Sequence, residues 1–537
     1  MIREKHRKQD IASGLSTAAL HLAAKGRMSA IDIAQEAAAL DRSPAILAAR
    51  CKVSLNLYDI DSLKESVAAI EAVAGASGAL ESLLADIRSG PFAVQTLADR
   101  LLQRRPLALQ PVPGRILYVL HKSLPEANDG YAMRSHGIAQ GLLAQGADVV
   151  CATRPGFPSD LAAGKPSGYQ LDHAEIVDGV HYHRMTSPMR GDAPAAAYEY
   201  MTYGSLAYLE GATARLAQLM RQHRPACVVA ASNFATALPA CLAAHELGLP
   251  FVYEVRGFWD LTRAARDPSY PLTITGRQER FLEAATARAA AHVITLTAPM
   301  RDELVARGVA PERITLAPNA CDPERFSPAS RDANLTQRFN LPSDIPIIGY
   351  VGSFNQYEGL SDLVHACGTL QKEGFDFRLL LVGSEPADEA GQFPVTQEIQ
   401  LAAAKERLGD RLVMPGRVSH DEVSNWYSLI DIAPFPRRAL PLTELVSPLK
   451  PLEALAMAKA VIVSSTGGIL GMVRDGETGL VFKKDSVEAL TDTLRMMLLD
   501  QAMRRRLGAA GRAWIVEQRS WRHAADEILG AVRPLVR

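Results

Sequence analysis

The sequence SPLKPLEALA at residues 447–456, followed by AVIV at 460–463 and SSTGG at 464–468, does most to decide the fold. These stretches predict a proline-opened helix, a buried strand and a glycine-containing loop, respectively. A helix start offers unpaired backbone N–H groups and the positive end of its dipole, and Lys450 adds a cation there. The segment therefore predicts a binding site for a phosphorylated ligand. A surface helix with a solvated lysine is the alternative interpretation.

The length and composition of the chain indicate a globular protein of several domains. Its 537 residues exceed what one hydrophobic core holds, so about two or three domains are expected. With 58 Lys and Arg residues against 59 Asp and Glu, the net charge of -1 gives no electrostatic basis for nucleic acid as a partner. The six cysteines form no CxxC pair and no zinc spacing, which fits a reducing compartment. Because we find neither a long apolar run nor a signal-peptide core, we expect a cytoplasmic protein.

The sequence pattern changes twice along the chain. Residues 1–106 place Ala and Leu at helical spacing and predict a helical extension of about four or five short helices. The proline-containing stretch 107–114 predicts a stiff linker. Beyond it, apolar runs alternate with helical stretches, which predicts an α/β fold of two Rossmann-like, doubly wound domains. We expect a first sheet domain, a hinge, a second sheet domain and a C-terminal helix at 115–321, 322–346, 347–515 and 516–537.

The predicted strands divide between these two domains. In the first domain they lie at 115–120, 148–152, 226–230, 251–255 and 292–296. In the second domain they lie at 347–352, 378–383, 412–414, 430–434 and 460–463. Ligands of doubly wound domains bind at the carboxyl ends of the strands, so two such domains joined by a hinge predict a shared catalytic cleft.

Several motifs give the chain a family resemblance. They are PNACDPERF at 318–326, GYVGSF at 349–354, LLLVGSEP at 379–386, PGRVSHDEVSNWYSLIDIAPFP at 415–436, SPLKPLEALA at 447–456 and SSTGGILGMVRDGETGLVF at 464–482. In this order and spacing, the residues from about 113 to the C-terminus resemble the GT-B nucleotide-sugar glycosyltransferases, above all the retaining enzymes of family 4. The end of the chain, SWRHAADEIL at 520–529, resembles the helix that crosses back onto the first domain in such enzymes.

The resemblance implies a reaction and its substrates. An acceptor hydroxyl displaces a nucleoside diphosphate from a sugar, and the protein supplies cations and N–H donors around the departing diphosphate. It implies a nucleotide-sugar donor such as a UDP- or GDP-sugar, a glycan or lipid-linked acceptor, and no metal or other cofactor. It places the enzyme in bacterial polysaccharide or envelope glycan biosynthesis, in the cytoplasm or peripherally at the inner membrane.

The resemblance also implies roles for individual residues. Lys450 would neutralise the diphosphate, and Glu453 would bind the ribose hydroxyls. Arg256 would stabilise a diphosphate, and Glu254 would orient the acceptor. Further donor contacts are implied for Asn319, Gly352, Ser353, Asn355, Glu385, Arg417, Val418, Ser447, Pro448 and Leu449. On the acceptor side they are implied for His121, Gly130, Tyr131 and Arg134, the last reaching a phosphate or an acid.

The chain departs from the family pattern at two places. The first of two glutamates usual in the family falls on Leu445, with Glu444 one position out of register. The lysine usual after the glycine turn is replaced by Glu358, and we interpret Lys450 as the cation that restores the lost charge. On this interpretation, Lys450→Ala damages the diphosphate site, whereas Glu358→Lys costs far less.

Two alternatives and one region stay open. A noncatalytic GT-B scaffold that binds a sugar or a partner, or a nucleotide-sugar epimerase of the same fold, would fit the same motifs. The extension at 1–106 is a candidate for contact with a protein partner or a membrane surface, and the oligomeric state is not decided by the sequence. Because the donor site lies elsewhere, a chain shortened to begin near Pro111 is expected to fold and bind nucleotide.

Overall fold

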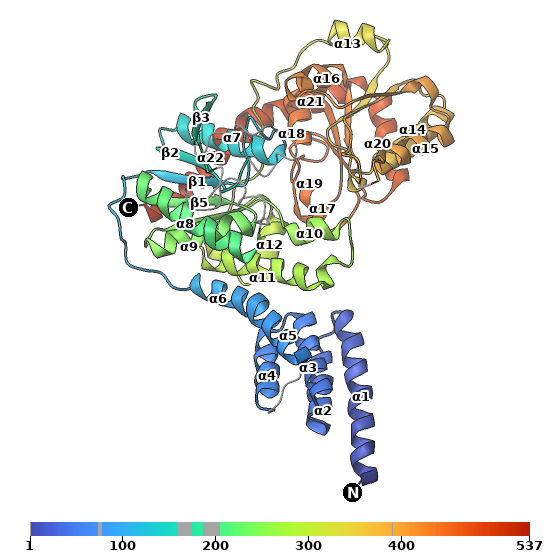
Figure 1. Ribbon diagram of the computed structural model, residues 1–537. Helices are drawn as coiled ribbons and strands as arrows, with labels where there is room; N and C mark the ends of the chain where they lie inside the picture. The colour runs from blue at the N-terminus through green and yellow to red at the C-terminus, as the bar shows by residue number, and fades with distance from the viewer. Residues whose placement is uncertain (1, 74–77, 159–172, 186–203, 389, 537) are drawn as a thin grey trace.

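The computed structural model describes residues 2–73, 78–158, 173–185, 204–388 and 390–536. Figure 1 shows an N-terminal group of helices that projects from a larger body made of two α/β domains. Two doubly wound domains preceded by helices confirm the predicted fold class. Within the described ranges, no helix is both long and apolar enough to cross a membrane.

The N-terminal region is built on closely packed alanines. Its helices are α1 (Ile2–Ala24), α2 (Ala30–Leu40), α3 (Pro44–Leu57), α4 (Ile60–Glu71), α5 (Gly78–Ile87) and α6 (Ala93–Arg100), with a short π-helical turn at Arg88–Phe92 before α6. Ala19, Ala23, Ala30 and Ala34 are buried between α1, α2 and α3. Small side chains let the helices approach closely, and alanine has the highest helix propensity.

The last of these helices packs into the neighbouring domain. Val94, Leu97 and Leu101 are buried in the core of the first sheet domain, not in that of α1–α5. The ring Nδ1 of His245 lies 2.8 Å from the carbonyl oxygen of Leu101, and the amide of Arg105 donates to the carbonyl of His245 at 3.0 Å. The chain around α6 is therefore part of the first sheet domain in its packing.

The first domain is built on a largely parallel sheet in the order β3-β4-β2-β1-β5-β6-β7-β8, in which only β3 is antiparallel to its neighbour. Its strands are β1 (Ile116–Leu120), β2 (Val149–Thr153), β3 (His173–Val177), β4 (Val180–Arg184), β5 (Cys227–Ala231), β6 (Phe251–Val255), β7 (His292–Thr295) and β8 (Ile314–Leu316). The five predicted strands are present as β1, β2, β5, β6 and β7. Their continuous apolar runs reflect burial on both faces of the sheet.

The helices between the strands of this domain, together with the last helix of the chain, cover this sheet. They are α7 (Gly130–Ala144), α8 (Leu206–His223), α9 (Phe234–Glu246), α10 (Trp259–Ala264), α11 (Ile274–Ala289), α12 (Ala298–Ala306) and the C-terminal α22 (Trp521–Val532). Helix α22 packs against α7 so closely that a Cβ added to Gly137 would lie 2.4 Å from the Trp521 ring. The chain passes between the two domains twice, near Cys321 and near Arg519. These two segments lie side by side, since the amide of Cys321 donates to the carbonyl of Arg519 at 2.9 Å.

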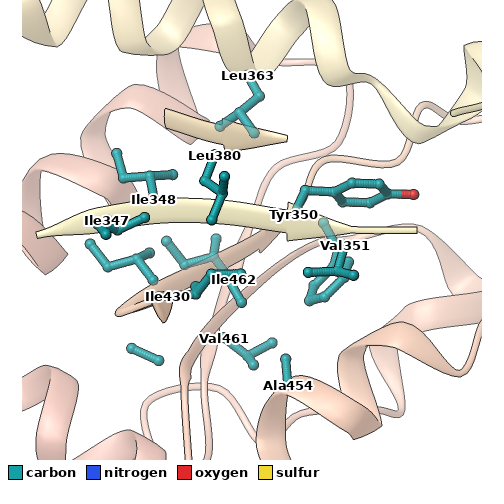
Figure 2. Close-up of a cluster of buried hydrophobic side chains, with 14 of the residues drawn as sticks. Ile347, Ile348, Tyr350, Val351, Leu363, Leu380, Ile430, Ala454, Val461 and Ile462 are labelled. Carbon is teal, nitrogen blue, oxygen red and sulfur yellow. The ribbon is translucent and has the colours of Figure 1, made fainter. Parts of the chain in front are cut away.

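The second domain has a fully parallel sheet in the order β11-β10-β9-β12-β13-β14. Its strands are β9 (Ile347–Val351), β10 (Arg378–Val382), β11 (Leu412–Gly416), β12 (Ile432–Phe435), β13 (Ala460–Ser464) and β14 (Leu480–Phe482). The surrounding helices are α13 (Ala333–Arg338), α14 (Leu360–Lys372), α15 (Pro394–Glu406), α16 (Val423–Leu429), α17 (Pro441–Leu445), α18 (Lys450–Ala456), α19 (Gly467–Leu470), α20 (Val487–Leu499) and α21 (Gln501–Gln518). Figure 2 shows how Ile347, Ile348, Leu380 and Ile462 fill the core around β9.

A shortened chain that lacks α6 is expected to be less stable than one that keeps it. Each buried apolar side chain contributes about 2 kcal/mol, and removal of Val94, Leu97 and Leu101 exposes the apolar surface that they cover. A chain that begins at residue 88 should unfold thermally near the temperature of the full chain. One that begins at Pro111, which the sequence alone suggested would fold and bind nucleotide, should unfold at a lower temperature because it lacks these contacts. Equal unfolding temperatures, followed by circular dichroism, would show that α6 is dispensable to the first domain.

Candidate active site

The two sheet domains contact each other through residues 445–449. The hydroxyl of Thr297, which follows β7, donates to the carbonyl of Leu445 at 2.7 Å. Gly130, the first residue of α7, faces the Leu449 side chain, to which an added Cβ would lie 3.6 Å away. Residues beyond the carboxyl ends of the first sheet thus meet the entry to α18, and the predicted cleft lies where the two domains meet.

A glycine turn at the carboxyl ends of β9 and β10 lies beside Lys450. Gly352 and Gly383 have φ angles of +148° and +139°, a region that side chains rarely adopt. A Cβ on Gly383 would lie 1.9 Å from the Gly352 carbonyl oxygen, and a Cβ on Gly352 would lie 2.3 Å from Cε of Lys450. The stem of Lys450 therefore runs directly over the Gly352 backbone, and both positions require glycine. The neighbouring Ser353 is exposed, and Asn355 is half-buried.

Lys450 and Glu358, the two positions of the charge exchange, form an ion pair. The Lys450 Nζ lies 3.2 Å from Glu358 Oε1 and donates to the Tyr350 hydroxyl at 2.5 Å. Burial alone would raise the pKa of Glu358, but the charges of Lys450 and Arg437 hold it below its ordinary value. Burial lowers the pKa of Lys450, and Glu358 opposes that effect. The structure brings the exchanged charges together, so Glu358→Lys would place a third cation in a buried cluster and should not be the mild change that the sequence suggests.

Glu453 lies at a cavity between the domains. The cavity has a volume of about 190 Å³ and is lined by His136 and Asp178 from the first domain and by Asp322, Arg325, His420 and Glu453 from the hinge and second domain. Burial raises the pKa of Glu453 to about 7, and Lys450 and Arg325 act in the opposite direction. The Tyr427 hydroxyl lies 3.4 Å from Glu453 Oε2. The carboxylate predicted to bind ribose thus borders a space into which polar groups of both domains project.

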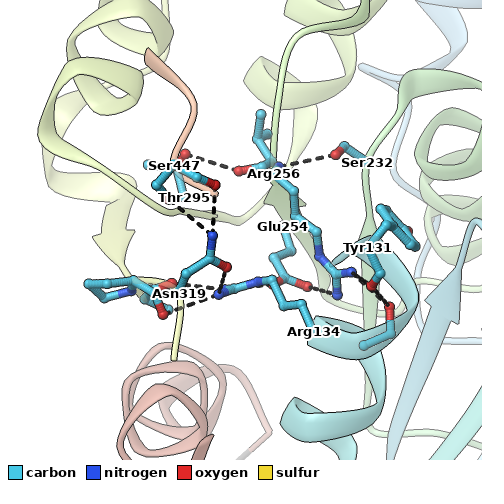
Figure 3. Close-up of polar contacts among 12 residues, drawn as sticks. Tyr131, Arg134, Ser232, Glu254, Arg256, Thr295, Asn319 and Ser447 are labelled. Carbon is cyan, nitrogen blue, oxygen red and sulfur yellow. Dashed lines mark hydrogen bonds and ion pairs between the residues drawn. The ribbon is translucent and has the colours of Figure 1, made fainter. Parts of the chain in front are cut away.

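Glu254 is the centre of a buried polar network (Figure 3). Its Oε1 accepts from Arg134 Nε at 2.9 Å and its Oε2 from Arg256 Nη2 at 2.8 Å, and the Tyr118 hydroxyl also donates to it. Burial opposes ionisation, but the two guanidinium groups lower the pKa of Glu254 to about 2. Glu254 is therefore ionised at neutral pH and is held by two cations, which makes it a poor proton acceptor.

Arg134, expected to reach a phosphate or an acid, donates to the Glu254 carboxylate and to backbone groups. It is 2% exposed, and beyond Glu254 its Nη atoms donate to the carbonyls of Ala317 at 2.8 Å and Pro318 at 3.1 Å and to Asn319 Oδ1 at 3.1 Å. Asn319 Nδ2 in turn donates to the carbonyl and hydroxyl of Ser447 at 2.9 and 3.0 Å. The acid that Arg134 reaches is thus the internal carboxylate of Glu254, and the residue links α7 to the donor-side loop.

Arg256 is also held within the first domain. Its Nη1 donates to the Tyr131 carbonyl at 3.1 Å and the Ser135 hydroxyl at 2.7 Å, and its guanidinium lies 4.4 Å from the centre of the Tyr131 ring. Close contact with Glu254 keeps the pKa of Arg256 high although burial opposes this. Arg256 thus fixes the backbone at the start of α7.

The predicted acceptor residues gather around the loop before α7. Asp129 caps α7 by accepting from the Tyr131 and Ala132 amides at 3.1 and 3.2 Å, and Gly130 is exposed. The His121 ring lies edge-on to the Tyr131 and Trp259 rings, with centroids 5.7 and 5.3 Å away. Burial and the charge of Arg154 lower the pKa of His121 well below 6.5, so this histidine is neutral at physiological pH.

The other residues predicted to contact the donor differ in how exposed and how engaged their side chains are. Both carboxylate oxygens of Glu385 accept backbone amides of Val395 and Thr396, at 3.1 and 2.6 Å, and so they cap α15. The expected donor contact of Glu385 stays a prediction, for a carboxylate that already caps a helix. Arg417 is exposed and makes no ion pair with any residue that the structure describes, Val418 is half-buried, and Pro448 is half-buried before α18.

Neither Glu444 nor Leu445, the two residues at the place of the first family glutamate, supplies an unpaired carboxylate. Glu444 Oε1 lies 2.6 Å from the Lys484 Nζ, and its Oε2 accepts the Gly467 amide at 2.9 Å. Leu445 packs against the core of the first domain. Position 445 therefore supplies an apolar contact between the domains where the family pattern has a carboxylate.

The sequence-based prediction missed Arg437. This residue is 4% exposed, follows β12 and places its Nε 3.7 Å from Glu358 Oε1. An arginine just beyond a predicted central strand, at the edge where ligands of parallel sheets bind, was the available signal. Gly383 was likewise missed as the residue that makes room for the Gly352 turn.

Comparison with known proteins identifies relatives over both sheet domains. Residues 129–320 match the family model of the glycosyl transferase 4-like domain, and residues 332–514 match that of glycosyl transferases group 1. Alpha-D-kanosaminyltransferase from Streptomyces kanamyceticus is 25% identical over 303 residues, which cover 55% of this chain and 73% of that protein. Lipopolysaccharide 1,2-N-acetylglucosaminetransferase from Salmonella typhimurium is 27% identical over 214 residues, which cover 40% of this chain and 54% of that protein, about half its length.

The fold is also that of a solved structure. The crystal structure of Anabaena HepE in complex with UDP and glucose aligns over 78% of this chain and 99% of its own chain, with a TM-score of 0.59 and 14% sequence identity. At this identity the likeness concerns the fold alone.

The raised pKa of Glu453 predicts a pH dependence of stability. The pKa of Glu453 is about 7 in the folded chain and exceeds its ordinary value of 4.5. The contribution of its protonation to the free energy of unfolding is therefore fully present below pH 4.5 and is lost as the pH rises through 7. The unfolding temperature of the wild type relative to Glu453→Gln should therefore be lower at pH 8 than at pH 5. Glu477→Gln, at an exposed position, is the control. A pH-independent difference for Glu453→Gln would contradict the assignment.

Proposed function

The chain belongs to the GT-B glycosyltransferases that resemble family 4, and from this premise we propose that it moves a sugar from a nucleotide-sugar donor to a glycan or lipid-linked acceptor with retention of configuration. The observation that carries the proposal is the position of Lys450, which lies over the glycine turn at the carboxyl end of β9. A cation beside an accessible backbone turn suits a diphosphate. UDP bound to a protein of the same fold supports the nucleotide class.

In the proposed reaction the protein's own cations stabilise the leaving group. Negative charge develops on the departing nucleoside diphosphate, and Lys450 with the Gly352 turn meets it there. Neither a metal nor another cofactor is then required. Glu254 is held ionised by Arg134 and Arg256, so we assign the acceptor proton to the departing phosphate and not to this carboxylate.

On the acceptor side, the proposal assigns the loop before α7 and its aromatic neighbours. Tyr131 and Trp259 are half-buried and flank the neutral His121, an arrangement that suits the apolar face of a sugar ring. A role in bacterial polysaccharide or envelope glycan biosynthesis is supported by the Salmonella relative named for lipopolysaccharide. Such a role places the protein in the cytoplasm or at the inner membrane, with residues 1–106 as the surface for a protein or membrane partner.

A panel of ligands tests this function on the full chain. UDP-, GDP-, ADP-, dTDP- and CMP-sugars are compared by thermal shift, and release of the nucleotide is then followed by chromatography. One base class should raise the unfolding temperature, since a ligand that binds the folded state stabilises it by mass action. Binding without turnover, with or without added acceptors, would favour a noncatalytic scaffold. Absence of binding to every donor would overturn the proposal.

Removal of the Lys450 charge should damage the donor site. We expect Lys450→Ala to weaken nucleoside diphosphate binding and to reduce turnover by roughly 100-fold or more, as loss of a preorganised electrostatic donor does. Affinity for the matching nucleoside should stay near that of the wild type. Lys483→Ala, which removes an exposed lysine of the same domain, should change neither affinity.

The paired affinities of the Lys450 variant decide its role. Equal losses for diphosphate and nucleoside would indicate a collapsed site, and an unchanged diphosphate affinity would exclude a phosphate contact for Lys450.

A further inference from the structure

Arg437 is fixed at the centre of the carboxyl edge of the second sheet. It lies two residues beyond β12, which pairs with β9 on one side and β13 on the other. The Ser464 hydroxyl, at the end of β13, donates to the Arg437 carbonyl at 2.8 Å, and the Arg437 Nη1 donates to the Val446 carbonyl at 2.9 Å. The guanidinium lies 5.5 Å from the centre of the Tyr357 ring. Backbone and side chain are thus both held at the edge where doubly wound domains bind ligands.

Around Arg437 there are more positive than negative groups. Glu358 Oε1 lies 3.2 Å from the Lys450 Nζ and 3.7 Å from the Arg437 Nε, so one carboxylate serves two cations. All three side chains are largely withdrawn from solvent, and Arg437 and Glu358 are 4% and 2% exposed. Charges away from water interact strongly with their neighbours. An anionic ligand would therefore be attracted to this cluster.

Arg437 also has an unused donor. Its Nε is buried and has no hydrogen-bond acceptor among the residues that the structure describes. A buried donor without an acceptor costs stability, and such groups are uncommon in folded proteins unless a partner is missing. An oxygen of a ligand would supply the acceptor.

The glycine turn itself offers no side-chain cation. Residues 352–358 have the sequence GSFNQYE, whose one charged side chain is the carboxylate of Glu358. A diphosphate in a sugar nucleotide carries two negative charges, and a single lysine leaves one of them without a partner. The excess cation beside this turn is Arg437.

We propose that Arg437 is the second cation of the donor site and binds the diphosphate together with Lys450, while Glu358 holds the two cations beside the Gly352 turn. The inference rests on the proposed function and deepens it. The planar guanidinium can donate two parallel N–H bonds to phosphate oxygens, whereas an ammonium acts as a point charge. Arg437 therefore adds directional recognition of the diphosphate to the charge of Lys450.

A purely structural role for Arg437 makes a different prediction. Its bond to the Val446 carbonyl holds the loop between β12 and α18, and loss of that bond alone would disturb the whole donor site. Nucleoside and nucleoside diphosphate would then lose affinity equally. A diphosphate contact predicts loss for the diphosphate alone.

The test compares Arg437→Gln and Arg437→Lys in the full chain with Arg438→Gln as the matched control. Glutamine removes the charge and keeps a donor for the Val446 carbonyl. Lysine keeps the charge and loses the two parallel N–H donors of the guanidinium. The side chain of Arg438, the next residue, pairs with Asp362 at 2.8 Å and Glu398 at 3.2 Å, whereas Glu358 pairs with Lys450 and Arg437. The probes are UDP, GDP, ADP and dTDP, each measured against its own nucleoside by calorimetry, with unfolding temperature as the check on folding.

We expect Arg437→Gln to lower the preference for diphosphate over nucleoside by roughly 10-fold or more, in line with the loss of a charged hydrogen bond. Arg437→Lys should lie between this variant and the wild type, and Arg438→Gln should keep the wild-type preference. If Arg437→Gln does not fold, the ratio of diphosphate affinity to nucleoside affinity in Arg437→Lys decides the matter. An unchanged preference in the folded Arg437 variants, or equal losses for diphosphate and nucleoside, would overturn the inference.

The outcomes separate this inference from the proposed function. If the wild type prefers none of the four diphosphates over its nucleoside, the nucleotide-sugar function fails, and the inference falls with it. If the wild type shows the preference, Lys450→Ala loses it and both Arg437 variants keep it, the function stands and only the role of Arg437 fails.

Discussion

The arrangement of the cleft depends on one buried carboxylate, that of Glu254. It lies at the end of β6 and receives Arg134 from α7 and Arg256 from its own loop. With Glu254 in place, Arg134 reaches the carbonyls of residues 317 and 318 and the side chain of Asn319, and Asn319 reaches Ser447 of the second domain. A continuous chain of hydrogen bonds thus runs from the first sheet to the entry of α18. Removal of the carboxylate would leave two buried guanidinium groups without their anion, which is far costlier than loss of a surface ion pair.

Each side of the cleft holds two cations around one buried carboxylate. In the first domain all donors of Arg134 are spent on Glu254, two carbonyls and Asn319, so its charge is committed to structure. In the second domain Lys450 and Arg437 share the single carboxylate of Glu358, and the Nε of Arg437 has no acceptor among the described residues. The Nε of Arg256 likewise has no acceptor among the described residues, so what sets the second cluster apart is the position of Lys450 over the Gly352 turn. The acceptor side presents aromatic rings and a neutral His121.

The fold could be predicted because buried parallel strands read as continuous apolar runs. All ten predicted strands are present in the structure, whereas β3, β4, β8 and β14 were missed. Strands β3 and β4 carry residues such as His173, His181 and Arg184 that interrupt the apolar pattern, and β8 and β14 have only three residues each. At the site, the exchange of charge between Glu358 and Lys450 could be inferred from residue types, and the ion pair places them together. Residue type alone could not show that Arg134 binds Glu254, Asn319 and two carbonyls, because these partners come from distant segments. Nor could it show that Glu385 accepts the amides that open α15.

The replacement of a family carboxylate by Leu445 is best understood through the contact between domains. Leu445 and Val446 pack against the core of the first domain, and the Leu445 carbonyl accepts from Thr297. The adjacent Val446 carbonyl accepts from Arg437, and the Ser447 carbonyl accepts from Asn319. The carbonyls of three successive residues, 445–447, therefore accept from Thr297, Arg437 and Asn319, respectively, with two residues between them and the start of α18. Apolar packing at position 445, together with these bonds, holds the segment that leads into α18 against the first domain.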